Sequence, residues 1–241
     1  MAGFIDSIAG GGGLISLPAY LMAGLPPHTA LGSNKLSSSI GLVFSTGTYL
    51  KEGYVYKPLI PISIVGALIG SWIGASTVLL MDEQILRWIM VIAIPIITLL
   101  LILKKDLLVP EAREVNRVRE QIIAAVVALT IGWYDGFFGP GAGTFLMLAF
   151  VGILKLEAVT AAGNTKVVNL CSNVAALTVF IMAGTVNYAL ALPAAAFGIL
   201  GNVIGAKLTV KNGVKIIKPI MLIVVFLLML RVLWDLLGIG T

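Results

Sequence analysis

Long apolar blocks dominate this chain and constrain its fold more than any other feature. An α-helix rises about 1.5 Å per residue, so about 20 apolar residues cross the hydrocarbon core of a bilayer. Only 11% of the residues are charged, whereas a soluble domain carries roughly 25%. The sequence therefore predicts an all-α polytopic membrane protein. Its apolar blocks lie at 3–24, 29–50, 58–80, 85–103, 121–154, 160–182, 187–208 and 216–237.

The pattern of the chain argues against two other classes of protein. Alternating segments of about ten residues, which are typical of outer-membrane barrels, are absent from the sequence. The net charge of +5 could suggest nucleic-acid binding, but the basic residues collect in short joins between apolar blocks, as the positive-inside rule describes. We therefore expect a multi-pass protein of the cell (inner) membrane, with the lipid bilayer and no nucleic acid as partner. The sequence leaves open whether the chain forms a homo-oligomer.

Polar joins divide the chain into two parts. The stretch 104–120 holds five basic residues and is predicted to be a cytoplasmic linker between a first transmembrane repeat at 1–103 and a second at 121–241. A second basic join, from Lys207 to Lys218, is also expected in the cytoplasm. The N-terminus lacks the features of a signal peptide. The first helix is expected either to be short or to start upstream of residue 1.

The two parts repeat each other when the chain is shifted by 131 residues. The segment 29–35 then matches 160–166, and Gly70 and Gly74 match Gly201 and Gly205. Two residues of slippage bring Asp6 and the glycines 10–12 onto Asp135 and the segment 139–141. Repeats with interrupted helices at corresponding positions indicate the binding site of a transporter. We therefore expect two repeated halves of about four transmembrane segments each.

The relative orientation of the halves follows from the basic joins. Both joins can be cytoplasmic only if residues 121–208 cross the membrane an even number of times. The block 121–154 would be about 51 Å long as one straight helix, too long for a single ordinary crossing. Inverted halves are therefore the preferred topology, and parallel halves remain the alternative.

The paired motifs resemble a known family. Asp6 followed by a glycine cluster, and the run Gly32-Ser33-Asn34-Lys35, are similar to the first half of the sulfite exporter TauE/SafE family. Asp135 with Gly139-Pro140-Gly141, and Gly163-Asn164-Thr165-Lys166, are similar to its second half. The resemblance covers essentially the whole chain, although the first helix is shorter than in other members. It implies a membrane permease for sulfur oxyanions or organosulfonates, and leaves substrate and direction open.

The apolar blocks 3–24, 29–50, 121–154 and 160–182 hold one charged residue each, namely Asp6, Lys35, Asp135 and Lys166. A charge at the centre of a membrane helix costs about 2.5–3.5 kcal/mol, so such residues are functional candidates. We expect the lysines to face each other across the two halves and to attract an anion. The aspartates would carry protons or keep the empty site near neutral. Alternatively, the lysines reach the membrane surface and the aspartates cap helices.

Polar residues accompany each lysine. Lys166, Asn169 and Asn173 follow a helical spacing that places them on one face. Such groups could hydrogen-bond an anion, or they could join helices to each other. The predicted substrate-binding residues, in addition to the lysines, are Ser33, Asn34, Ser38, Asn164, Thr165, Asn169 and Asn173.

The glycine clusters should break their helices and expose backbone amides at the start of the next one. Half-helix N-termini carry partial positive charge and hold anionic groups in transporters. The predicted residues are Gly12 and Gly13 in the first half, and Gly141, Gly143 and Thr144 in the second. A simple packing kink is the alternative.

We therefore predict a secondary transporter of a small anion that works by alternating access and is coupled to protons or to the membrane potential. An anion channel is the alternative. An enzyme is not expected, because one histidine and one cysteine cannot build a metal cluster and no nucleophile–base set is evident. No cofactor is expected.

Overall fold

A computed structural model describes residues 1–86, 88, 116–213, 215–217 and 219–220. Every regular element in these ranges is a helix. The predicted linker at 104–120 lies outside the described residues except for its last five positions. The apolar blocks at 85–103 and 216–237 fall largely outside them as well.

The first apolar block forms two helices rather than one. Helix α1 (Ala2–Ala9) ends at Gly10, whose φ of 78° is a left-handed conformation that glycine adopts at little cost. Helix α2 (Gly13–Met22) follows after the glycine cluster. The chain then forms α3 (Pro27–Lys51), a short 3₁₀ turn η1 (Lys57–Leu59) and α4 (Ile60–Leu79). The predicted glycine break is confirmed.

The second part of the chain has four α-helices of similar arrangement, without a counterpart of η1 among its described residues. Helix α6 (Arg117–Phe137) ends before Gly139 and Gly141, which both have positive φ. It is followed by α7 (Ala142–Gly152), α8 (Ala158–Met182) and α9 (Tyr188–Asn212). Helices α3 and α8 both have 25 residues, and they begin at 27 and 158, which is 131 residues apart. This is the spacing at which the sequence repeats.

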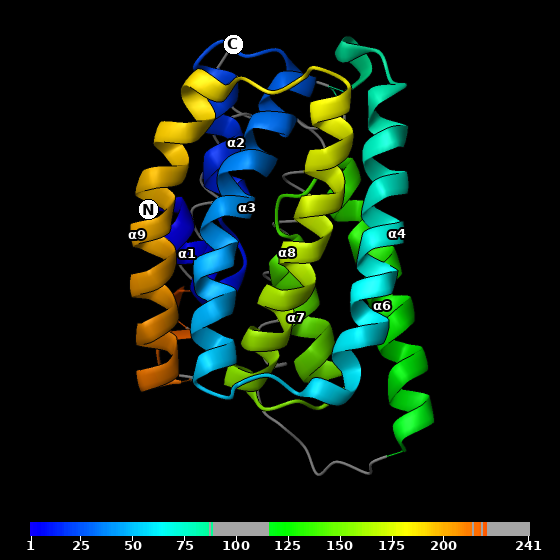
Figure 1. Ribbon diagram of the computed structural model, residues 1–241, viewed down its shortest axis with the longest axis vertical. Helices are drawn as coiled ribbons and strands as arrows, with labels where there is room; N and C mark the ends of the chain where they lie inside the picture. Colours follow the sequence, from blue (N-terminus) through cyan, green and yellow to red (C-terminus); the bar gives the residue numbers. More distant parts are fainter. Residues whose placement is uncertain (87, 89–115, 214, 218, 221–241) are drawn as a thin grey trace.

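Corresponding helices run in opposite directions (Figure 1). Helix α3 descends in the view while α8 ascends, and α4 ascends while α9 descends. Helix α3 packs against both α8 and α9, whereas α4 packs against α6 and α8. The α4–α6 contact is close because it is built on glycine: a Cβ on Gly74 would lie 2.0 Å from the carbonyl oxygen of Trp133. Small residues serve this purpose in membrane helix pairs.

The distribution of side chains is that of a protein in a bilayer. Three of the described helical segments are long and apolar enough to cross a bilayer. They are Lys57–Leu79, Ala158–Met182 and Tyr188–Asn212. Large apolar side chains such as Trp72 and Phe197 are exposed, while the polar residues of α3 are mostly buried. A chain in lipid places its polar groups inside in this way. The all-α membrane fold is therefore supported.

Candidate functional site

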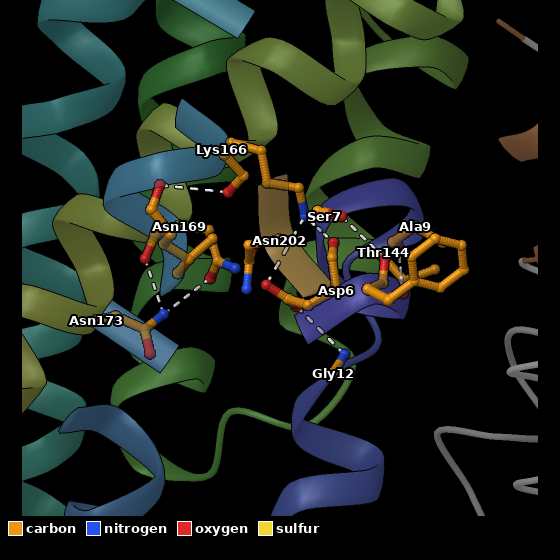
Figure 2. A network of polar contacts seen from close by, with 12 residues as sticks. Asp6, Ser7, Ala9, Gly12, Thr144, Lys166, Asn169, Asn173 and Asn202 are labelled. Atoms are coloured by element: carbon orange, nitrogen blue, oxygen red, sulfur yellow. Dashed lines mark hydrogen bonds and ion pairs between the residues drawn. The ribbon is translucent and has the colours of Figure 1, made fainter. Parts of the chain in front are cut away.

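The two helix breaks touch each other inside the helical bundle. A Cβ on Gly10 would lie 2.3 Å from the carbonyl carbon of Gly143, and a Cβ on Gly143 would lie 2.7 Å from the Cα of Gly10. No side chain fits at either position. The hydroxyl of Thr144, in the first turn of α7, donates to the carbonyl of Ala9 at the end of α1 over 2.8 Å (Figure 2). The contact therefore joins the end of one half-helix to the start of the other.

A short ion pair lies beside this contact. The Nζ of Lys35 on α3 is 2.8 Å from Oδ1 of Asp135 on α6, and both side chains are almost fully buried. The other carboxylate oxygen of Asp135 accepts hydrogen bonds from Ser172 at 2.5 Å and Asn173 at 3.1 Å. The Asp135 carboxylate is thus held by three donors. We call this arrangement the tight pair.

A second ion pair involves the corresponding residues of the repeat, and its geometry is different. Lys166 on α8 donates to the backbone carbonyl of Asp6, and its Nζ is 4.0 Å from the carboxylate oxygen Oδ2. The other carboxylate oxygen of Asp6 accepts from the amide of Gly12 at 3.2 Å (Figure 2). We call this arrangement the loose pair. Its lysine also lies at the C-terminal end of α1, where the helix dipole is negative.

Both pairs cross between the two parts of the chain. Lys35 of the first part meets Asp135 of the second, and Lys166 of the second meets Asp6 of the first. Lys35 and Lys166 are each only 1% exposed, so neither reaches the surface as the snorkelling alternative required. Two ammonium groups face two carboxylates, and the four formal charges sum to zero. Each lysine therefore already has an anionic partner in this structure.

A small chamber lies between the tight pair and Asp6, and Lys166 is not among the residues that line it. Its volume is about 20 Å³, which is room for about one water molecule. Residues from both halves line it, and nine of them were predicted from the sequence: Asp6, Gly13, Asn34, Lys35, Ser38, Asp135, Gly143, Asn169 and Asn173. The structure therefore brings most of the predicted polar residues to one place.

A larger cavity of about 340 Å³ borders the chamber on the side of α1, α2, α3 and α9. Asp6 and Ser38 line both spaces. The predicted residue Gly12 lines the larger cavity only. Asp6 is thus the charged residue that the two spaces share.

Ser33 and Asn164, at matching positions of the repeat, lie away from the chamber. The hydroxyl of Ser33 accepts from the amide of Asn187 at 2.9 Å, and the side chain of Asn164 accepts from the amide of Tyr56 at 2.7 Å. Tyr56 and Asn187 also match each other: Tyr56 lies between α3 and α4, and Asn187 lies between α8 and α9. These two polar residues therefore hold loops of the opposite half, which agrees with the alternative of helix joining.

The other predicted residues have separate positions. Thr165 is buried, and its hydroxyl has no hydrogen-bond partner within the described ranges. Gly141 is the N-cap of α7, with a φ of 83°. Within the same ranges, no three His, Cys, Asp or Glu side chains gather in a group that could hold a metal ion.

Several polar residues around the site were not predicted. Ser16 donates to Asn34 at 2.6 Å, and Tyr20 donates to Ser37 at 3.0 Å, so α2 is joined to α3 by side chains that line the larger cavity. Ser16 and Tyr20 are spaced i, i+4 in an otherwise apolar helix, a signal that could have identified them. Ser172 and Asn202 carried no comparable signal.

Comparison with known proteins places these residues in a wider context. The sequence profile described as "Sulfite exporter TauE/SafE" matches residues 1–232. A probable membrane transporter protein ORF9 of Sinorhizobium sp is 37% identical over 236 residues, which cover 98% of this chain and 89% of the relative. A probable membrane transporter protein YfcA of Escherichia coli (strain K12) is 35% identical, with 98% and 87% covered. A probable membrane transporter protein of Haemophilus influenzae is 33% identical, with 98% and 91% covered. No solved structure matches.

Proposed function

Because the chain belongs to the sulfite exporter TauE/SafE family of membrane transporters, we propose that it is a secondary transporter of a small anion by alternating access. The proposed substrate is a sulfur oxyanion or an organosulfonate, and the proposed location is the cell membrane. The observation that carries this proposal is the set of two buried lysine–aspartate pairs at the contact between two broken helices. Buried charge of this kind is expensive in a membrane and is found where function requires it.

Alternating access follows from an inverted arrangement of the two halves, which is part of the proposal. The opposite directions of α3 and α8, and of α4 and α9, support it. The reciprocal contacts of Ser33 and Asn164 with loops of the opposite half also support it. When the two halves of a transporter are inverted relative to each other, their equivalent surfaces face opposite sides of the membrane, so one half can close while the other opens.

The chemistry of the site suits an anion that replaces a carboxylate. An ammonium and an anion 4 Å apart attract by about 4 kcal/mol at an effective dielectric of 20. Desolvation of both groups opposes this gain. The amides of Asn169 and Asn173, with the N-terminal ends of α2 and α7, would supply the further hydrogen bonds. An oxyanion is larger than the 20 Å³ chamber, so binding requires that an aspartate or a half-helix moves.

Transport assays in proteoliposomes test this proposal. Purified protein should take up at least one of sulfite, sulfate, thiosulfate and methanesulfonate, and the same anion inside the vesicles should accelerate uptake. Such counterflow is expected of a carrier, whereas a channel conducts without it. Uptake without counterflow would favour the anion channel, and no uptake of any anion would overturn the proposal.

Two lysine variants connect transport to the site. Lys166→Met and Lys35→Met should both abolish binding in calorimetry on monodisperse, folded protein. Lys166→Arg should restore binding only in part, because a planar guanidinium presents its donors differently from an ammonium. Unchanged affinity in both methionine variants would contradict a site at these residues.

A further inference from the structure

Asn202 on α9 has a buried oxygen without a partner. The residue is 2% exposed, and its Nδ2 donates to the carbonyl of Gly198 at 3.1 Å. Because a carbonyl can only accept, this contact fixes the orientation of the amide and leaves Oδ1 as the free acceptor. Oδ1 has no hydrogen-bond partner in the described part of the chain. An unsatisfied buried acceptor is costly, so its presence calls for an explanation.

Asn202 lines the cavity that Asp6 also lines. A Cβ on Gly3 would be 2.7 Å from Nδ2 of Asn202, so the amide packs on α1 one turn before Asp6 and on the same face. Figure 2 shows Asn202 between Asn169 and Asp6. Asn202 and a carboxylate cannot hydrogen-bond through two acceptor oxygens. If the carboxyl carried a proton, its O–H could donate to Asn202.

The two aspartates differ in how strongly their surroundings hold the ionised carboxylate. Asp135 has Lys35 at 2.8 Å and donors from Ser172 and Asn173, so all its interactions are those of an ionised carboxylate. Asp6 has one backbone donor at 3.2 Å and an ammonium 4.0 Å away, and it borders the larger cavity. Asp6 is therefore the carboxylate that can give up its charge at lower cost.

We propose that Asp6 takes up the proton that accompanies the anion, and that Asn202 holds the protonated carboxyl by accepting its O–H. This inference rests on the proposed anion transport. A proton from water adds to the carboxylate of Asp6, which releases Lys166 from its ionic partner. The anion then pairs with the Lys166 ammonium. One proton and one monovalent anion enter together, so the net charge of the loaded site equals that of the empty site.

The other charged and titratable groups around Asp6 keep their states in this step. They come from α2, α3, α6 and α8: Tyr20, Lys35, Tyr49, Asp135 and Lys166. Lys35 stays paired with Asp135, and Tyr49 donates to the carbonyl of Ser7. A sodium ion in place of the proton would lie close to the ammonium of Lys166, which repels it. The local charges thus favour a proton over a metal cation.

Calorimetry on the unaltered protein tests the inference. The probe is methanesulfonate, a monovalent anion that stays fully ionised near neutral pH and takes up no proton itself. Titrations in buffers of different protonation enthalpy give the number of protons taken up, and about one per anion is expected. Binding without proton uptake, or binding that requires sodium, would overturn the inference and leave anion transport intact. If no anion binds at all, the proposed function itself fails.

Two variants then identify the residues. Asp6→Asn supplies an amide donor to Asn202, so it should keep binding while proton uptake falls to zero. Asn202→Leu should weaken binding about fivefold, the effect of one neutral hydrogen bond. Ser71→Ala is the matched control, since Ser71 occupies the position of Asn202 in the other half and donates to the carbonyl of Ser172; its proton uptake should equal that of the unaltered protein. Normal proton uptake in Asp6→Asn would contradict the assignment.

Discussion

The tight and loose pairs use the same residue types at matching positions of the repeat, yet they are built differently. In the tight pair the ammonium and carboxylate are 2.8 Å apart, and two further side chains hold the carboxylate. In the loose pair they are 4.0 Å apart, and the ammonium instead binds a backbone carbonyl. The surroundings differ too, because only the loose pair's aspartate borders the larger cavity. This difference agrees with the alternating access that we propose, in which one half is closed while the other is open.

The largest difference should appear when each aspartate is removed. Asp135→Ala leaves Lys35 buried without a counter-charge, which costs about 3–5 kcal/mol of stability. Asp6→Ala should cost about half as much, because Lys166 keeps the backbone carbonyl of residue 6. Thermal unfolding in detergent measures both. Equal losses, or a larger loss for Asp6→Ala, would remove the distinction between the pairs.

A double variant is the control for this first prediction. Lys35→Met with Asp135→Leu removes both charges of the tight pair together. Replacing a buried ion pair by apolar residues of similar volume is often neutral or stabilising. Most of the stability lost in Asp135→Ala should therefore return, while anion binding should not.

A smaller effect should follow when one donor of the tight pair is removed. Ser172→Ala deletes the 2.5 Å hydrogen bond to Asp135, and a hydrogen bond to a charged group contributes about 1.5–3 kcal/mol. The unfolding temperature should fall, though by less than in Asp135→Ala. When Asp135→Ala is already present, adding Ser172→Ala should lower the unfolding temperature little further. An undiminished effect there would show that Ser172 acts independently of the pair.

The smallest effect concerns the residue next to the lysine of the loose pair. Thr165→Val removes a buried hydroxyl that has no hydrogen-bond partner in the described ranges and keeps the side-chain shape. Stability should stay the same or rise by up to about 1 kcal/mol, since no hydrogen bond is lost and a desolvated group is removed. A clear loss of stability would indicate a partner for Thr165, and the two environments would then be more alike than the structure indicates.

Much of the fold was predictable because it depends on local chemistry. Glycine clusters break helices, so the positions of both breaks followed from the sequence. The match between 29–35 and 160–166 predicted a repeat, and α3 and α8 begin at the same spacing of 131 residues. The buried positions of Lys35 and Lys166 could be expected as well, because charges in apolar blocks turn toward the protein interior.

The pairing within the site could not be predicted. Spacing along the chain does not tell which of two equivalent aspartates a lysine meets, and that choice depends on how the halves pack. The roles of Ser33 and Asn164 were open to prediction from helix geometry. Each lies two residues before a lysine, about 200° around the helix, and so points away from the chamber. When the segments 32–35 and 163–166 are treated as continuous motifs, residues on opposite faces of the helix are assigned to the same site.

The crossed pairs have a consequence for the synthesis of the protein. Lys35 is made 100 residues before its partner Asp135, and Asp6 is made 160 residues before Lys166. At about 5–20 residues per second, the ribosome needs about 5–20 seconds to supply Asp135 after Lys35. During that time the first half lies at the membrane with one buried lysine and one buried aspartate, each lacking its final partner. The first half must therefore hold these charges near each other or near water until the second half arrives, and the insertion machinery has to tolerate that intermediate.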